Sequence, residues 1–125
     1  MVLGANHHGN TGLEPYLAEG FLCWWERATD LSVMLSSLGT SGFFADRLDF
    51  AQVSAVGFSL GGYTAMALAG AQTCLDEFET WRRANGITEG GPREFPDAAD
   101  RIPALMETSN AFCRSQAEHG HDRTD

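Results

Sequence analysis

Gly57-Phe58-Ser59-Leu60-Gly61-Gly62 is the stretch that decides the fold expected for this chain. It has the pattern Gly-x-Ser-x-Gly, which exposes a serine where a strand turns sharply into a helix. Gly57 and Gly61 have no Cβ to clash at so tight a turn. The flanking residues fit, because Gln52–Val56 is typical of a short buried strand and Leu60–Ala71 of a helix rich in Ala and Gly. The order predicted is therefore strand, turn and helix.

Ser59 is the candidate nucleophile of this turn. A helix that begins directly after it directs unpaired N–H groups at the turn, so the Leu60 N–H is a candidate donor to an oxyanion. The competing interpretation is a chance glycine-rich turn without chemistry. Nucleotide binding is not expected, because the chain lacks Gly-Lys-Ser/Thr and these glycines do not follow Gly-x-Gly-x-x-Gly.

The first part of the chain predicts an α/β fold. Val2–Ala5 is typical of a strand, and apolar residues at helical spacing predict a helix over Phe21–Leu38, which Gly39 would end. Together with the strand, turn and helix around Ser59, this order is typical of a parallel sheet with right-handed crossovers. We therefore expect residues 1–73 to form a sheet-containing core.

The second part of the chain has a different pattern. Helices are expected over Leu75–Arg83 and Ala104–Glu118, and no strand candidate follows Ser59. A helical segment of this kind is typical of a cap over an active site, or of a surface helical pair with no gating role. We expect residues 74–118 to form the cap-like segment and residues 119–125 a disordered tail.

Composition restricts the partners and the compartment. The chain has 125 residues, enough for one domain, and a net charge of −9, which argues against nucleic acid or an anionic membrane and favours a small neutral or cationic substrate. No apolar run is long enough to span a membrane, and no signal peptide is visible, so the chain is expected in the cytoplasm unless a longer protein carries a signal upstream. Three cysteines without CxxC spacing predict neither a disulfide framework nor a zinc ribbon.

Four stretches carry a family resemblance: Ala5-Asn6-His7-His8-Gly9-Asn10-Thr11, Trp25-Glu26-Arg27-Ala28-Thr29-Asp30-Leu31, Val56-Gly57-Phe58-Ser59-Leu60-Gly61-Gly62-Tyr63-Thr64-Ala65 and Glu94-Phe95-Pro96-Asp97. They resemble the bacterial predicted dienelactone hydrolases, α/β-hydrolases that are also similar to platelet-activating-factor acetylhydrolases. The resemblance implies a serine hydrolase that cleaves carboxylic esters through an acyl-enzyme, with Ser59 as nucleophile and the Leu60 N–H in the oxyanion hole. It implies a small-molecule ester as substrate and no cofactor.

The chain departs from the family pattern at both ends. The family's upstream His-Gly-rich loop and its later acid and histidine have no counterpart here, so the chain resembles a central fragment with a partial α/β-hydrolase fold. His7 and His8 follow the first predicted strand, at the sheet edge where such folds keep their sites. With Phe58 they are candidate pocket residues, the competing interpretation for the histidines being a solvated loop.

Two internal sites remain as alternatives. The order of a catalytic triad is met by Ser59, Asp97 or Asp100, and His119 or His121. A frayed tail holds a general base poorly, and the two aspartates are expected to cap the start of the last helical segment instead of taking part in chemistry. His119 and His121 with a further histidine or cysteine could bind a metal, but no spacing fixes that geometry and no metal is expected.

The alternative function is of another class. In it the chain is a non-catalytic, truncated fragment that only associates with itself or with a partner. The helices expected in the core would expose apolar faces without the rest of a sheet, which favours self-association. These faces comprise Leu31, Met34, Leu35 and Leu38 on one helix and Met66 and Leu68 on the other.

Overall fold

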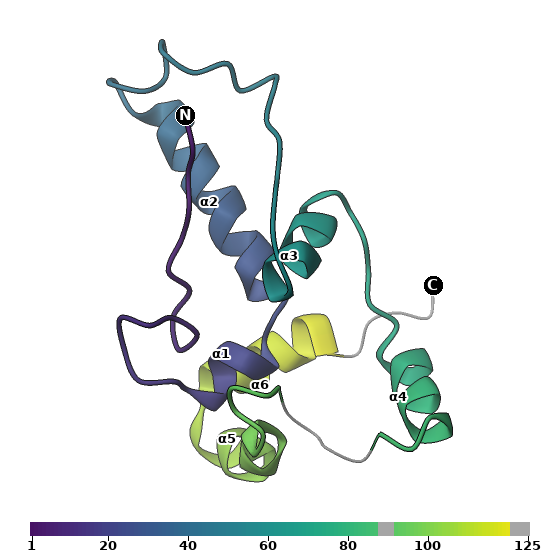
Figure 1. Ribbon diagram of the computed structural model, residues 1–125. Helices are drawn as coiled ribbons and strands as arrows, with labels where there is room; N and C mark the ends of the chain where they lie inside the picture. The colour runs from purple at the N-terminus through teal and green to yellow at the C-terminus, as the bar shows by residue number, and fades with distance from the viewer. Residues whose placement is uncertain (88–91, 121–125) are drawn as a thin grey trace. The chain divides into compact units, whose positions relative to one another are not determined.

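The computed structural model describes residues 1–87 and 92–120, and this part of the chain consists of helices joined by loops (Figure 1). No sheet forms in the described residues, whose β pairing is limited to an isolated bridge between His7 and Asn10. The predicted α/β fold, with its parallel strand–helix–strand unit, is therefore wrong. The structure is mainly helical.

The two predicted strands are loops without partner strands. Val2 and Val56 are each 97% exposed, and the chain before α3 runs straight and unpaired (Figure 1). Parallel strands need neighbours along their edges and cover on both faces, and two strands alone are marginal. Apolar residues in a strand-like pattern therefore form no sheet in the residues that the structure describes.

The chain divides into two compact units. Unit 1 comprises Met1–Ala5 and Trp24–Ala71 and contains two helices, α2 (Glu26–Thr40) and α3 (Leu60–Leu68), which contact each other (Figure 1). All residues of unit 1 are described, and none of its apolar side chains is buried; the buried residue of α3 is Thr64. Unit 1 is therefore held by a few specific contacts between its helices and not by an apolar core.

Unit 2 comprises residues 6–23 and 72–125 and contains the buried core. Phe21 and Ala98 lie at its centre, and the Phe21 ring meets the Phe95 ring edge-on, with centroids 5.6 Å apart. A perpendicular aromatic pair of this kind adds about 0.5–1.5 kcal/mol to the free energy of area burial. The helical segments of unit 2 are α1 (Ala18–Leu22), α4 (Leu75–Ala84), η1 (Ala98–Arg101), α5 (Ile102–Thr108), α6 (Asn110–Ser115) and the π-helical turn η2 (Gln116–Gly120).

Several helix boundaries differ from the expected ones. The helix expected over Phe21–Leu38 begins only at Glu26, because Cys23 has φ −103° and ψ 51° and leaves the helical region after α1. The helix expected over Ala104–Glu118 is interrupted at Ser109, whose extended backbone starts α6 and whose hydroxyl accepts a hydrogen bond from the Phe112 N–H at 3.2 Å.

The remaining predictions about organisation have different outcomes. The division into a core of residues 1–73 and a cap-like segment of residues 74–118 stays a prediction. Of the expected tail, His119 and Gly120 belong to η2, and residues 121–125 lie outside the described residues. Within the described residues, no helix has the length and apolar character needed to cross a membrane.

Candidate functional site

Ser59 has the most unusual backbone conformation of the described chain. Its φ is 52° and its ψ −123°, and among the described residues other than glycine it alone has a positive φ. Helix α3 begins at the next residue, Leu60, and the Ser59 residue is exposed. The sharp turn predicted from the Gly-x-Ser-x-Gly pattern is thus present, although no sheet precedes it.

Gly57 is required by the close approach of the chain to itself in this turn. A Cβ at Gly57 would overlap the carbonyl group of Gly61 and lie 2.7 Å from the Gly62 nitrogen. These are backbone atoms of α3, so rotation of a side chain could not remove the clash. At Gly61, by contrast, a Cβ would meet no atom within 4 Å. The expected need for glycine therefore holds at Gly57 and not at Gly61.

The Leu60 N–H is held in a fixed direction by the peptide group that it shares with Ser59. The Ser59 carbonyl accepts hydrogen bonds from the Gly62 N–H at 2.8 Å and the Tyr63 N–H at 3.2 Å. Because the C=O and N–H of a trans peptide point in opposite directions, the Leu60 N–H faces away from the body of α3. It has no hydrogen-bond partner in the described part of the chain. An N–H in this position can donate to an oxygen that becomes negative beside Ser59.

Helix α2 supports the start of α3 through a polar contact, and Trp24, two residues before α2, adds an aromatic contact. The Arg27 Nε donates to the Thr64 Oγ1 at 3.1 Å, and the Thr64 hydroxyl donates to the Leu60 carbonyl at 2.9 Å. The Trp24 and Tyr63 rings stand perpendicular, with centroids 6.4 Å apart. Partial burial lowers the pKa of Arg27 from its ordinary value, and the charge of Asp30 opposes this shift.

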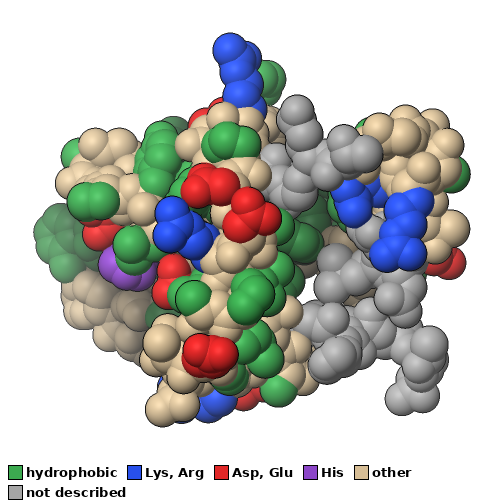
Figure 2. All heavy atoms as spheres, turned by 90° about the horizontal axis from the view of Figure 1, so that it is seen from below, with side chains coloured by type: hydrophobic (Ala, Val, Ile, Leu, Met, Phe, Trp, Pro, Cys, Tyr) green, Lys and Arg blue, Asp and Glu red, His purple; other side chains and the backbone are tan. Residues whose placement is uncertain are grey.

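The residues before Ser59 are open to solvent. Phe58, a candidate pocket residue, is 94% exposed, and its carbonyl accepts a hydrogen bond from the Gly61 N–H at 2.9 Å. Hydrophobic side chains also lie at the surface among acidic ones on the face drawn in Figure 2. The Ser59 turn of unit 1 is therefore open to solvent.

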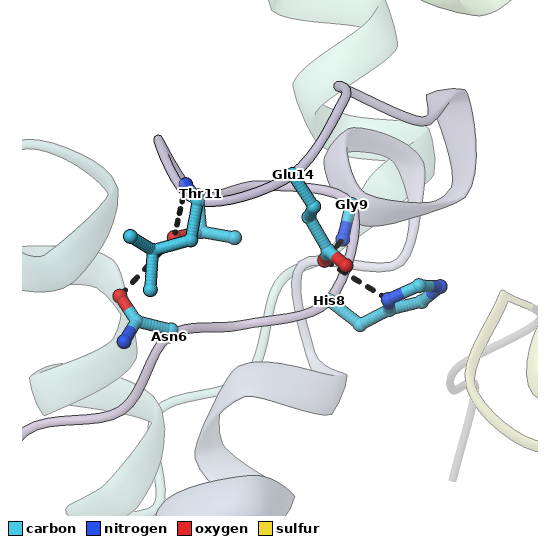
Figure 3. A network of polar contacts seen from close by, with 6 residues as sticks. Asn6, His8, Gly9, Thr11 and Glu14 are labelled. Atoms are coloured by element: carbon cyan, nitrogen blue, oxygen red, sulfur yellow. Dashed lines mark hydrogen bonds and ion pairs between the residues drawn. The ribbon is translucent and has the colours of Figure 1, made fainter.

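His7 and His8 belong to unit 2, in a loop closed by a carboxylate (Figure 3). Glu14 Oε1 accepts a hydrogen bond from the Gly9 N–H at 2.6 Å and lies 2.9 Å from the His8 Nδ1. His7 is buried, and its carbonyl accepts from the Asn10 N–H at 3.1 Å. The structure thus places these two candidates in unit 2 and the turn at Ser59 in unit 1.

The structure gives little support to the two alternative sites, the internal catalytic triad and the metal site. Asp97 lies 3.3 Å from the Arg101 guanidinium and precedes η1, where its side chain makes no capping hydrogen bond, and Asp100 lies within η1. The side chain of His119 and all of His121 lie outside what the structure describes. Among the described residues, no group of three or more His, Cys, Asp or Glu side chains is arranged to hold a metal ion.

The contact between Arg27 and Thr64 is the part of the site that the sequence analysis missed. Arg27 is not among the candidate site residues that the sequence predicted. Its position was nevertheless informative, because residues 24, 27 and 31 would share one side of the helix expected over Phe21–Leu38, with a cation between Trp24 and Leu31. The matching signal for a partner of Arg27 is Thr64, a polar residue in the Ala- and Gly-rich α3.

Comparisons with known proteins identify no relative of this chain. No protein-family model matches the chain, and no curated protein and no solved structure matches it either. The resemblance to the predicted dienelactone hydrolases therefore stays a hypothesis that rests on the residues quoted for it, and the function is argued from the turn at Ser59.

Proposed function

We propose that Ser59 is the nucleophile of a serine hydrolase that cleaves carboxylic esters. The observation that carries the proposal is the Ser59 backbone, with φ 52° and ψ −123°. A residue with a side chain in so sparsely populated a region costs on the order of 1–3 kcal/mol, and such strain is concentrated at functional sites. Here it exposes a hydroxyl directly before the first turn of a helix.

The chemistry follows from the groups at the turn. The Ser59 Oγ would attack the acyl carbon, the carbonyl oxygen would become negative, and the Leu60 N–H would donate to it. The ester C–O bond then breaks, the alcohol leaves with a proton, and water releases the acid from the serine. Loss of one such donor costs about 3 kcal/mol in transition-state stabilisation.

The proton of the Ser59 hydroxyl needs an acceptor. Unit 1 contains no histidine, so a histidine acting as general base would have to come from outside unit 1. The net charge of −9 favours neutral or cationic esters over anionic ones. A small, uncharged ester is therefore the substrate class with which to begin.

Covalent labelling tests the proposal. The full chain is treated with a fluorophosphonate, in which a serine oxygen displaces the fluoride on phosphorus. The adduct is located by mass spectrometry. We expect an adduct on Ser59, none in Ser59→Ala, and unchanged labelling in Ser54→Ala, the matched control five residues earlier. A folded protein that is not labelled, or is labelled elsewhere, contradicts the assignment of Ser59.

A second candidate function is association of the chain with a second copy of itself, without catalysis. The observation that favours it is the absence of any buried apolar side chain in unit 1, all of which is described, together with the exposure of Val56 and Phe58. Apolar side chains exposed on an unpaired segment can form an interaction surface.

Sedimentation velocity over a range of concentrations tests association. If the segment before Ser59 forms the contact, Val56→Ser should weaken it about tenfold or more, because a buried valine contributes about 1.5–3 kcal/mol. Val33→Ser, at an exposed position of α2, is the matched control and should change the association constant little. A chain that stays monomeric at every concentration excludes this function.

A further inference from the structure

Two hydrogen bonds in series connect helix α2 to the residue that follows Ser59. Arg27 Nε donates to Thr64 Oγ1 at 3.1 Å, and Thr64 Oγ1 donates to the Leu60 carbonyl at 2.9 Å. A threonine that bonds to the carbonyl four residues earlier is common in helices. The contribution of Arg27 is different, because it comes from another helix, 37 residues away in sequence.

The surroundings of Thr64 favour these two hydrogen bonds over hydrogen bonds to water. Thr64 is 3% exposed, so its hydroxyl has to be satisfied within the protein, and it both donates and accepts here. Arg27 is partly buried, and an arginine stays charged at all ordinary pH values. A hydrogen bond from a charged donor to a buried hydroxyl is among the stronger ones in proteins.

The two peptide groups that flank the Leu60 Cα are thereby both fixed. The first is held through the Ser59 carbonyl, which accepts from the Gly62 and Tyr63 N–H groups, and the second through the Leu60 carbonyl, which accepts from Thr64. With both groups held, the direction of the Leu60 N–H is set. The first group carries the Leu60 N–H itself, and the second fixes the start of the helix on which the first group rests.

We propose that Arg27 is a positioning residue, which acts through Thr64 to hold the Leu60 N–H as an oxyanion donor. This role rests on the proposed function of Ser59 as nucleophile. Arg27 touches neither substrate nor reacting atoms. It holds the start of α3 against α2, and its loss loosens the peptide groups beside the nucleophile.

Four variants of the full chain separate positioning from general stability. Thr64→Val keeps the shape of the side chain and removes the hydroxyl, whereas Thr64→Ser keeps the hydroxyl. Arg27→Met keeps the stem and removes the donors. Arg47→Met is the matched control, because Arg47 is the other arginine of unit 1 and stacks over the Phe43 ring at 4.5 Å.

Two readouts are measured on each variant. The first is the rate of fluorophosphonate labelling at Ser59, and the second is amide hydrogen exchange at Gly62 and Tyr63, whose N–H groups bond to the Ser59 carbonyl. For Thr64→Val and Arg27→Met we expect labelling to slow roughly tenfold and exchange at both amides to accelerate by a similar factor. Thr64→Ser and Arg47→Met should behave as the parent chain.

The double variant adds a sharper criterion. If Arg27 acts through Thr64, Arg27→Met combined with Thr64→Val should be no slower than the slower single variant. Should Arg27→Met lose its helical circular dichroism, Arg27→Lys, which keeps the charge and stem but not the Nε–H, takes its place with the same expected slowing. Should Thr64→Val lose it, the Arg27 variants decide the test.

The outcomes for the two proposals are distinguishable. Absence of labelling in the parent chain contradicts the role of Ser59, while faster exchange in Thr64→Val and Arg27→Met, restored in Thr64→Ser, still supports positioning. Unchanged exchange in both variants overturns the positioning role, whatever the labelling shows. If the effects of the two substitutions simply add in the double variant, the positioning role is overturned as well.

Discussion

Replacing Gly57 by Ala should open the turn at Ser59. The new Cβ would overlap the Gly61 carbonyl group and lie 2.7 Å from the Gly62 nitrogen, closer than the 3.0 Å below which real Cβ contacts essentially do not occur. Relieving a clash with backbone means moving the chain, at a cost of about 1–3 kcal/mol. Since 1.36 kcal/mol is a factor of ten, the population with the closed turn falls roughly 5- to 150-fold.

The assay is the second-order rate constant for fluorophosphonate labelling at Ser59, with circular dichroism as a check on helix content. Gly61→Ala is the matched control, because a Cβ there meets nothing within 4 Å and Ala is favoured over Gly in a helix by about 0.5–1 kcal/mol. We expect Gly57→Ala to lose labelling in proportion to the closed population and Gly61→Ala to keep it. Equal labelling of the two variants, both with intact helices, would refute the reasoning.

Three further pairs of substitutions probe strain, burial and backbone packing. Ser59→Gly should melt about 3 °C higher than Ser59→Ala, because glycine removes about 1 kcal/mol of net backbone strain; equal melting temperatures would mean that no strain is stored there. Phe112→Ala, at 2% exposure, should lower the free energy of unfolding by about 3–5 kcal/mol in urea titrations, and Phe58→Ala, at 94%, by less than about 0.5 kcal/mol; similar losses would contradict the described burial. Gly20→Ala places a Cβ 2.6 Å from the Gly9 carbonyl oxygen and should cost about 1–3 kcal/mol, whereas Gly12→Ala has open space and should be neutral in the same titration.

Local signals in the sequence predicted local structure well. Helix α3 begins at Leu60, directly after the predicted turn, and α4 spans Leu75–Ala84 where Leu75–Arg83 was expected. These features depend on neighbours in sequence: helical spacing of apolar residues, and a glycine where the chain turns back on itself. The interruption at Ser109 also had a local signal, since serine is a preferred first residue before a helix.

The sheet could not be predicted from its strands alone. Val53 and Val56 have the β-branched side chains favoured in strands, but β propensity measures how a residue fits a pleated surface that neighbours must provide. In the described residues no neighbour is present, and both side chains are exposed. The order of predicted strands and helices supplied the expectation of a sheet, and nothing within residues 52–56 could test it.

The turn at the candidate site was predictable, but its contacts with other parts of the chain were not. Ser59 and the Leu60 N–H follow from five residues of sequence. The link from Arg27 through Thr64 depends on how α2 crosses α3, which a single sequence does not specify. His7 and His8 were placed near the turn by analogy with a sheet edge, and they lie in unit 2, in a loop organised around Glu14.

The pairing of Phe21 with Phe95 sets an order for events during synthesis. Unit 2 is built from two segments, and most of unit 1 lies between them in the chain. At about 5–20 residues per second, the ribosome adds Ala98 roughly 4–15 s after Cys23. Helices α2 and α3 can meet within that interval, because both halves of their contact are already made. Phe21 of α1 waits longer, because its ring partner Phe95 is added only after both helices of unit 1.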